Sequence, residues 1–247
     1  MSAMTLTPDS FRNLARSSPW RWDSLRFTVS APGDNAAATR FWVRRPGALR
    51  VENADGQLLY STTSINDSRA DFYVADTRAS WLLPPQLVTP VYDDQGLVTR
   101  RPQAAYGEPI YQDAHFAALL DPAEIAGSAP VAFETPYLNP TRLDDLREED
   151  IDGRRAWVAT LTRTPYYRPA YPGFELVAEA PTEIALDLDT AVCVRSRALD
   201  GPHAGAGHDL KILGVDEYML DELFIPDDAP LTDVREHISW SLRSPSM

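Results

Sequence analysis

The chain has few of the residues that mark several common functional classes. Its 247 residues include one cysteine, Cys193, which excludes an internal disulfide framework and a zinc site built from several cysteines. Lys211 is the only lysine, and 23 basic residues stand against 36 acidic ones, a formal net charge of −13. Binding to a nucleic-acid backbone or to an anionic membrane surface needs clustered cations, so both are disfavoured.

Long apolar runs are also missing. No stretch approaches 18 apolar residues, so no membrane span is predicted. Residues 1–16 have no apolar core between a basic start and a cleavage site, and no lipobox cysteine is present, so a cytoplasmic protein is expected. Hydrophobic residues make up 44% and charged residues 24%, which is the composition of an ordinary folded protein.

Alternation of apolar and polar residues predicts two groups of short strands. Asp55-Gly56 marks a hairpin turn in the first group. The first group lies at 25–29, 39–45, 49–52, 58–62 and 70–74, and the second at 156–162, 183–189, 191–199 and 209–215. Their meander order indicates one antiparallel sheet of about nine or ten strands.

Helices are predicted before, between and after these groups. Thr7-Pro8-Asp9 is a strong helix start, so residues 7–17 are expected to be helical. In the middle, short helices are expected after Asp113 and after Asp121, where Glu124 completes a capping-box pattern. One or two helical turns are expected over 139–150, and the proline-rich residues 77–112 read as irregular. Apolar residues at helical spacing predict a C-terminal amphipathic helix at 228–247.

Three segments carry a family resemblance. Residues 41–50 form an aromatic strand, an Arg-Pro turn and a second strand, and Asp55-Gly56 follows. Residues 210–215 form a last strand, and a Leu-Phe-Ile-Pro tail ends at Pro226. This pattern resembles the LolA-like superfamily of lipoprotein carrier proteins, over about residues 7–227.

The resemblance implies a fold of the α+β class. It implies a curved antiparallel sheet, an incomplete barrel, with short helices packed on its concave face. Residues 1–247 would then be a single LolA-like domain, with a core over 7–227 and the C-terminal helix after it. Members of this superfamily hold an acyl chain or another hydrophobic ligand in the concave face. They are exported, whereas this chain shows no signal peptide, so lipoprotein transfer is not implied.

Five side chains are candidates to line such a cavity: Trp42, Leu49, Tyr60, Phe72 and Val158. The alternative is that the apolar residues of these strands are ordinary core and that neighbouring arginines snorkel to solvent. The arginines near Trp42, at 40, 44 and 45, are instead suited to holding the helices in place through hydrogen bonds.

Other chemical motifs are weaker. His203 and His208 lie near Asp200 and Asp209, but a glycine-rich solvated loop explains them better than a metal site. The acidic run over 144–152 fails the EF-hand pattern and reads as a solvated face or helix end. No cofactor or metal is expected.

Cys193 is predicted to share a strand face with Arg195, with no base to activate it as a nucleophile. Asp187 and Asp189 suit a hairpin approach and would work as an acid and a base only if another element opposed them. The proline- and tyrosine-rich residues 163–181 fit a partner-binding edge, a lid or a loop packed on the sheet.

The leading hypothesis is therefore non-enzymatic binding of a hydrophobic small molecule or acyl chain. The alternative is a protein-interaction or regulatory module with a filled core. An enzyme is disfavoured because no acid–base or metal constellation is seen.

Overall fold

The structure of the chain is a computed structural model. It describes residues 4–34, 38–63, 85–102, 108–111, 115–127, 138–171 and 173–226. The predicted strand at 70–74, with Phe72, and the predicted C-terminal helix at 228–247 lie outside these residues.

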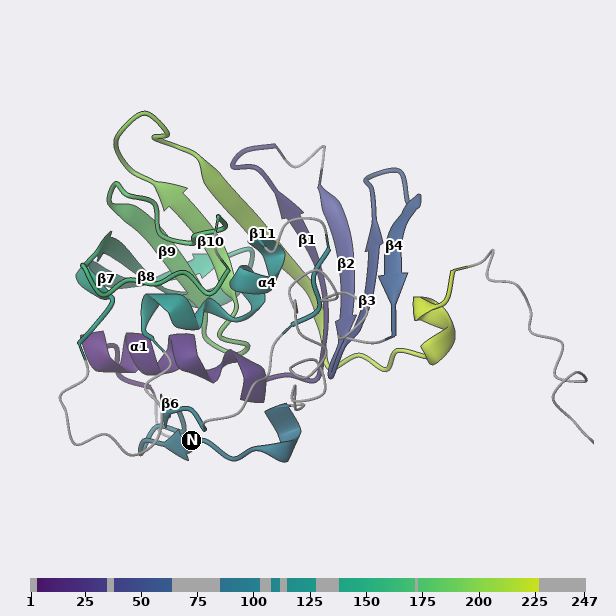
Figure 1. The fold of residues 1–247 in the computed structure, drawn as a ribbon, viewed down its shortest axis with the longest axis horizontal. Coiled ribbons are helices and arrows are strands. Elements are labelled where there is room, and N and C mark those ends of the chain that lie inside the picture. The colour runs from purple at the N-terminus through teal and green to yellow at the C-terminus, as the bar shows by residue number, and fades with distance from the viewer. Residues whose placement is uncertain are drawn as a thin grey trace, which may run out of the picture.

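A nine-stranded antiparallel sheet forms the body of the molecule (Figure 1). Its spatial order is β4-β3-β2-β1-β11-β10-β9-β8-β7. The strands are β1 Ser24–Ser30, β2 Thr39–Arg44, β3 Ala48–Glu52, β4 Leu58–Thr62, β7 Thr141–Ile151, β8 Arg154–Arg163, β9 Thr182–Asp187, β10 Cys193–Ala198 and β11 Gly207–Val215. Because β1 pairs with both β2 and β11, the N-terminal and C-terminal strands share one sheet. This confirms the expected α+β class with an open, curved antiparallel sheet.

Short helices and a small hairpin complete the fold. They are α1 Pro8–Ser17, η1 Ser18–Trp20, η4 Pro85–Leu87, β5 Val91–Tyr92, β6 Val98–Arg100, α4 His115–Leu120, η5 Pro122–Ile125 and η6 Asp221–Phe224. Thr7 caps α1 as predicted: its side chain accepts a hydrogen bond from the Ser10 amide, and Pro8 occupies the first turn. The β5–β6 hairpin shows that part of the region predicted as irregular is regular.

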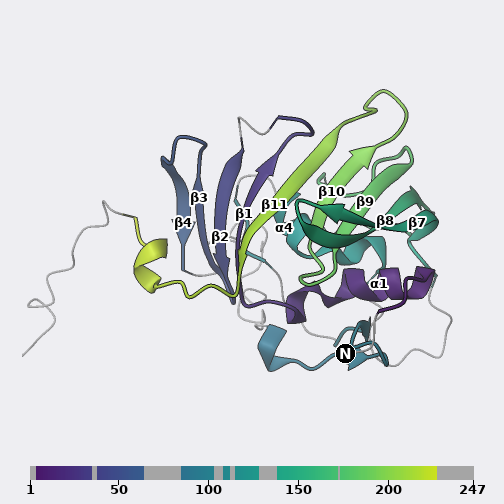
Figure 2. The same ribbon diagram turned by 180° about the vertical axis from the view of Figure 1, so that it is seen from behind.

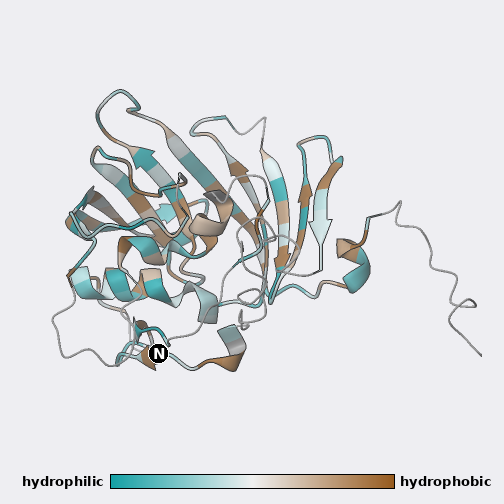
Figure 3. Cartoon of the chain, viewed as in Figure 1, coloured by the Kyte–Doolittle hydropathy of each residue, from teal (hydrophilic) through white to brown (hydrophobic). Residues whose placement is uncertain are grey.

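The two faces of the sheet have different surroundings. We call the face that carries Phe27 and Phe41 the inner face, because Phe41 packs there against Phe116 of α4. The opposite, outer face carries Thr28 and Arg40, which alternate with those aromatic residues. Viewed from behind, the sheet lies in front of α4 (Figure 2), and apolar and polar residues alternate along the strands (Figure 3).

The prediction of helical turns over 139–150 is wrong, since β7 occupies this segment. The strand pairs with β8 along most of its eleven residues, from Thr141 opposite Arg163 to Ile151 opposite Arg154. Ion pairs at i, i+2 spacing also stabilise the strand, as between Arg147 and Glu149. Such spacing places side chains on one face of a strand but not of a helix.

The capping prediction at residue 121 is also wrong. A short 3-10 helix begins at Pro122 as expected, but Asp121 makes no capping hydrogen bond. Its carboxylate instead receives two hydrogen bonds from the Arg101 guanidinium. Glu124 likewise turns away from the helix start toward residues 167–176.

Candidate functional site

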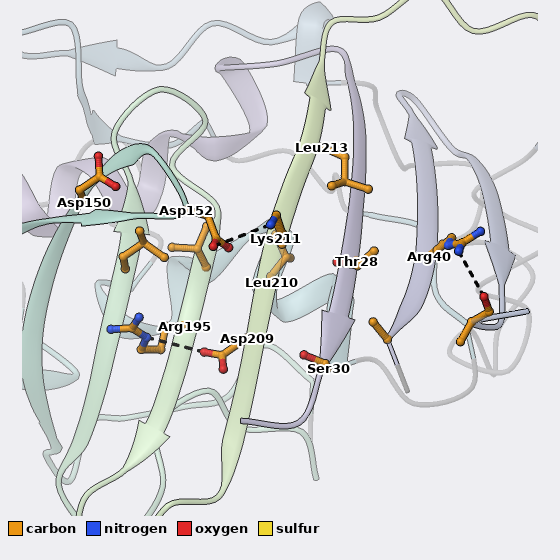
Figure 4. Close-up of a pocket in the computed structure, with 14 residues that line it drawn as sticks. Thr28, Ser30, Arg40, Asp150, Asp152, Arg195, Asp209, Leu210, Lys211 and Leu213 are labelled. Atoms are coloured by element: carbon orange, nitrogen blue, oxygen red, sulfur yellow. Dashed lines mark hydrogen bonds and ion pairs between the residues drawn. The ribbon is translucent and has the colours of Figure 1, made fainter. Parts of the chain in front are cut away.

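A cleft of about 610 Å³ opens on the outer face of the sheet (Figure 4). The outer positions of β1, β2, β10 and β11 form its floor and one wall. The turn between β7 and β8 forms the other wall. Most of the lining residues are polar or charged, and they include Thr28, Ser30, Arg40, Asp150, Asp152, Arg195, Asp209 and Lys211.

The β7–β8 turn reaches across the sheet to make this cleft. Asp152 lies 3.9 Å from the Lys211 Nζ, although β8 and β11 are separated by two strands in the sheet order. Asp152 and Gly153 both adopt left-handed backbone conformations, with φ of 54° and 78°. The Asp150 carboxylate accepts a hydrogen bond from the Gly153 amide, which fixes the turn. The sheet therefore curls, and the turn overhangs β11.

Paired charges cover the floor beside the cleft. The Arg147 guanidinium donates hydrogen bonds to Glu149 and to Glu183 on β9, both at 2.7 Å. Arg195 lies 3.6 Å from Asp209 and contacts Glu149 and Glu183 at 3.4 and 3.6 Å. This network fixes the side chains of β7 to β11 on the outer face, and the arginine stems lie over the sheet.

Arg40 forms part of the wall on the β2 side. It is exposed, and its guanidinium donates a hydrogen bond to the Ala54 carbonyl at 3.2 Å. Among the described residues, no carboxylate lies within ion-pair distance of Arg40. The cleft thus offers one cation whose charge a ligand is able to neutralise.

The inner face is filled where α4 covers it. Phe27 and Phe41 stack with ring centroids 4.9 Å apart, and Phe116 packs on Phe41 at 5.0 Å. Phe27, Leu49 and Leu119 are fully buried. At the β4 edge, Tyr60 packs against Tyr111 at 5.4 Å. The described part of the inner face is therefore a packed core.

The predicted cavity residues do not line one surface. Leu49 and Tyr60 lie on the inner face of β3 and β4. Val158 is fully buried, but its cross-strand neighbours place it on the outer side, in line with Ala185 and Arg195. Phe72 lies outside the described residues. The binding roles of these four residues stay predictions.

Trp42 lies on the outer face, opposite to Leu49 and Tyr60, and packs against a segment that we call the strap, residues 217–226. Met219, Leu223 and Phe224 of the strap form a small apolar cluster with Trp42 and Ala48. The binding role of Trp42 also stays a prediction, but its position indicates packing against the strap.

Arginines and a serine fix the strap by binding its backbone carbonyls. Arg44 donates to the Met219 carbonyl at 2.6 Å, and Arg50 donates to the Leu223 carbonyl at 3.0 Å. Ser61 Oγ donates to the Phe224 carbonyl at 2.7 Å. In Figure 1 the yellow η6 lies beside β3 and β4 accordingly.

Arg45 acts as the sequence suggested, by holding a helix through hydrogen bonds. Its buried guanidinium donates to the carbonyls of Ser18, Pro19 and Trp22 at 3.1, 3.2 and 2.6 Å. It also forms an ion pair of 2.6 Å with Glu108, and both side chains are 2% exposed. This pair joins the end of β2 to η1 and to the segment before α4.

Cys193 is a buried structural residue. Burial raises the pKa of its thiol, which opposes formation of a nucleophilic thiolate. The expectation that Cys193 and Arg195 share a face is wrong, because the β9–β10 register shifts between them. This bulge turns Cys193 toward the buried His208, with Sγ and Nε2 4.0 Å apart, and leaves Arg195 beside Asp209.

Asp187 is committed to the β9–β10 turn. Its carboxylate accepts hydrogen bonds from the Thr190 amide and hydroxyl at 2.8 and 2.7 Å, and it forms an ion pair with Arg154. Asp189 is bound to the same arginine at 3.3 Å. These contacts give the two carboxylates a structural role.

The 163–181 loop packs on the molecule through Glu124. The Tyr167 hydroxyl donates to Glu124 Oε1 at 2.5 Å, and the amides of Ala170 and Leu176 donate to the same carboxylate at 2.9 and 2.7 Å. Burial raises the pKa of Glu124, and these hydrogen bonds lower it in part. Burial and the neighbouring carboxylate raise the pKa of Tyr167. Of the three interpretations of this loop, packing fits its buried tyrosines.

Within the ranges that the structure describes, no group of three histidine, cysteine, aspartate or glutamate residues is placed to hold a metal ion. No helix of that same part of the chain is long and apolar enough to cross a bilayer.

The cleft residues were not predicted from the sequence to form a binding site. Thr28, Arg40 and Lys211 occupy polar positions of strands that were predicted correctly, so alternation places each on an outer face. The acidic run at 144–152 was interpreted as a solvated face or a helix end. Nothing in the sequence showed that its last residues return over β11, because that contact depends on the curl of the whole sheet.

Comparisons with known proteins give only distant likenesses. No protein-family model matches the chain, and no curated protein matches its sequence. The crystal structure of MucB is 13% identical with a TM-score of 0.35, covering 89% of this chain and 62% of that one. MucB in complex with MucA(peri) is 14% identical with a TM-score of 0.34, covering 90% and 60%.

A LolA superfamily protein from Nitrosomonas europaea is 12% identical with a TM-score of 0.24, covering 90% of this chain and 99% of that one. The chain thus spans less than two thirds of each MucB chain. At TM-scores below 0.5 these likenesses support no functional inference.

Proposed function

We propose that this chain is a non-enzymatic protein-interaction module that binds its partner at the outer-face cleft. The observation that carries the proposal is the contrast between the two faces. The described inner face is occupied by α4 and its aromatic contacts, whereas the cleft is open and lined mostly by polar or charged residues. A polar cleft suits polypeptide backbone and charged side chains better than an acyl chain.

The residues considered as a nucleophile or as an acid and a base have structural surroundings, which supports a non-catalytic role. The Cys193 thiol is buried with a raised pKa, and Asp187 is held by Thr190 and Arg154. The order of strands, helices and further strands fits the resemblance to LolA-like proteins. Acyl-chain binding, the leading hypothesis from the sequence, stays a prediction that the same experiment examines.

The test is a selection of random peptides of about 12 residues, displayed on phage, against the purified chain. Enriched peptides are then titrated into the chain and into Thr28→Tyr, which fills the cleft with a ring that suits a strand. Thr162→Tyr is the matched control, because Thr162 is a half-buried residue of β8 that does not line the cleft. A fluorescent fatty acid is titrated in parallel.

We expect peptides that bind the chain and Thr162→Tyr equally and lose about tenfold or more in affinity for Thr28→Tyr. Circular dichroism and thermal unfolding must show that both variants fold. Peptides indifferent to Thr28→Tyr, or saturable fatty-acid uptake with no peptide enrichment, would contradict the proposal.

A further inference from the structure

The two walls of the cleft carry opposite charges. Arg40 lies on the β2 side; Asp150 at the end of β7 and Asp152 in the turn that follows lie on the other side (Figure 4). Thr28 and Ser30 of β1 lie between them, as do Asp209 and Lys211 of β11. A ligand that crosses the cleft therefore passes from a cationic to an anionic wall.

The charged side chains on the floor of the cleft partly neutralise one another. Arg195 is surrounded by Glu149, Glu183 and Asp209 at 3.4 to 3.6 Å. Lys211 contacts Asp152 only at 3.9 Å, and these side chains are 57% and 49% exposed. Solvent screens a pair of this kind strongly, so Asp152 keeps its capacity to bind a second cation.

The wall charges have less compensation. Arg40 has a carbonyl partner and no carboxylate within ion-pair distance among the described residues. Asp150 accepts a hydrogen bond from the Gly153 amide, and no cation of the described part of the chain pairs with it. A ligand with an anionic and a cationic group would neutralise the charges of both walls.

The width of the cleft sets the spacing of those ligand charges. The turn reaches Lys211 on β11. Only β1 lies between β11 and β2, so these two strands are two strand spacings apart. Neighbouring strands lie about 4.8 Å apart, so the walls are roughly 10 Å apart. An extended polypeptide advances about 3.3 Å per residue, so about three residues cross this distance.

We infer that the cleft binds an extended polypeptide segment with an acidic and a basic side chain about three residues apart. The acidic side chain lies over Arg40 and the basic one over Asp150 and Asp152. This inference rests on the proposed function and specifies the partner's chemistry. It also predicts that the affinity falls as ionic strength rises, because exposed ion pairs are screened.

The test repeats the peptide selection on variants that remove one wall charge at a time. Arg40→Gln removes the cationic wall, and Arg142→Gln, an exposed arginine of β7 outside the cleft, is its control. The double variant Asp150→Asn and Asp152→Asn removes the anionic wall. Asparagine still accepts the Gly153 hydrogen bond and tolerates the left-handed conformation at residue 152.

The control for the double variant is Asp144→Asn with Asp145→Asn. These neighbouring carboxylates of β7 are 53% and 74% exposed, and residue 145 is also left-handed with φ of 54°. They do not line the cleft. The control therefore has the same change in charge and a similar demand on the backbone.

Peptides enriched on the unmodified chain should carry both charges at this spacing. Selection on Arg40→Gln should lose the acidic position alone, and selection on the double variant should lose the basic position alone. A single peptide should bind each variant about fivefold more weakly, as expected for one exposed ion pair. Neither control should change the peptides selected or their affinity.

Two results overturn the inference while leaving the proposed function intact. One is the enrichment of uncharged or singly charged peptides that Thr28→Tyr still excludes. The other is an unchanged set of peptides after both wall substitutions. A failure to enrich any peptide that depends on the cleft overturns the proposed function itself.

Discussion

Lys211 and Asp152 form an ion pair of 3.9 Å between β11 and the turn that joins β7 to β8. The pair joins two parts of a nine-stranded sheet that are separated by β9 and β10. The sheet must curl for these residues to meet, and the cleft lies where the turn overhangs the outer face.

The Lys211–Asp152 pair should contribute little to stability, because both side chains are about half exposed. Asp152→Asn should lower the free energy of unfolding by less than about 1 kcal/mol, so the melting temperature should fall by no more than about 2–4 °C. Thermal unfolding followed by circular dichroism measures this. A loss of several kcal/mol would show that the turn is stabilised mainly by the ion pair.

The buried Arg45–Glu108 pair should behave differently. Glu108→Gln should destabilise the protein by about 3 kcal/mol, because it leaves the Arg45 guanidinium buried without its counter-charge. Urea unfolding measures the effect, and Asp144→Asn, which breaks an exposed pair with Arg142, is the control. Equal small effects at both sites would mean that the carbonyls of residues 18, 19 and 22 are enough to stabilise the buried Arg45 guanidinium.

Glu124 should give stability a specific pH dependence. Burial raises its folded pKa above the ordinary value of 4.5, so the folded chain holds this proton more tightly than the unfolded chain. The contribution of Glu124 is therefore most favourable below pH 4.5 and declines as the pH rises through the raised folded pKa. Glu124→Gln does not titrate and provides the reference.

The measurement is the free energy of unfolding of both proteins from pH 4 to pH 8. The free energy of unfolding of the unmodified chain, minus the value for Glu124→Gln at the same pH, should decrease as the pH rises. A difference that increases with pH would mean that the hydrogen bonds from Tyr167, Ala170 and Leu176 outweigh the cost of burial.

Trp42 should be needed for stability more than for binding. Trp42→Ala removes its contacts with Met219 and Phe224 and should cost about 2 kcal/mol, less than for a fully buried tryptophan. Peptide binding at the cleft should stay within about twofold. Unchanged stability with lost binding would instead place Trp42 in the binding surface.

Local patterns in the sequence predicted most of the elements. Thr7 and Pro8 determined the start of α1, and Asp55-Gly56 determined the β3–β4 hairpin. Alternation of polar and apolar residues placed β1 to β4, β10 and β11. The strands β8 and β9 were also predicted, although both of their faces are buried along the middle of each strand. These signals act over a few residues and are therefore readable in a single sequence.

The errors arose where tertiary contacts override local signals. Residues 139–150 were predicted to form helical turns, but pairing with β8 and arginine–carboxylate contacts stabilise a strand. Asp121 has the position of a cap, but Arg101 binds its carboxylate. After Cys193 a bulge shifts the alternation by one residue, and no local sequence pattern indicates this bulge.

The candidate site was harder to predict than the fold. Its residues come from β1, β2, β10, β11 and the β7–β8 turn, and their meeting depends on strand order and sheet curvature. The apolar residues chosen from the sequence are mostly core or strap contacts. The cleft instead uses polar outer positions, which alternation alone does not distinguish from any solvated strand face.

The most direct measurement is the position at which a bound peptide crosslinks to the chain. A cleft-dependent peptide carrying a benzophenone group is irradiated in complex, and adducts are located on tryptic fragments by mass spectrometry. The predicted adducts lie on residues 27–40, 148–154 and 198–211, which contain both walls and the floor of the cleft. Adducts confined to residues 101–142, which contain α4 on the inner face, would contradict binding at the outer face.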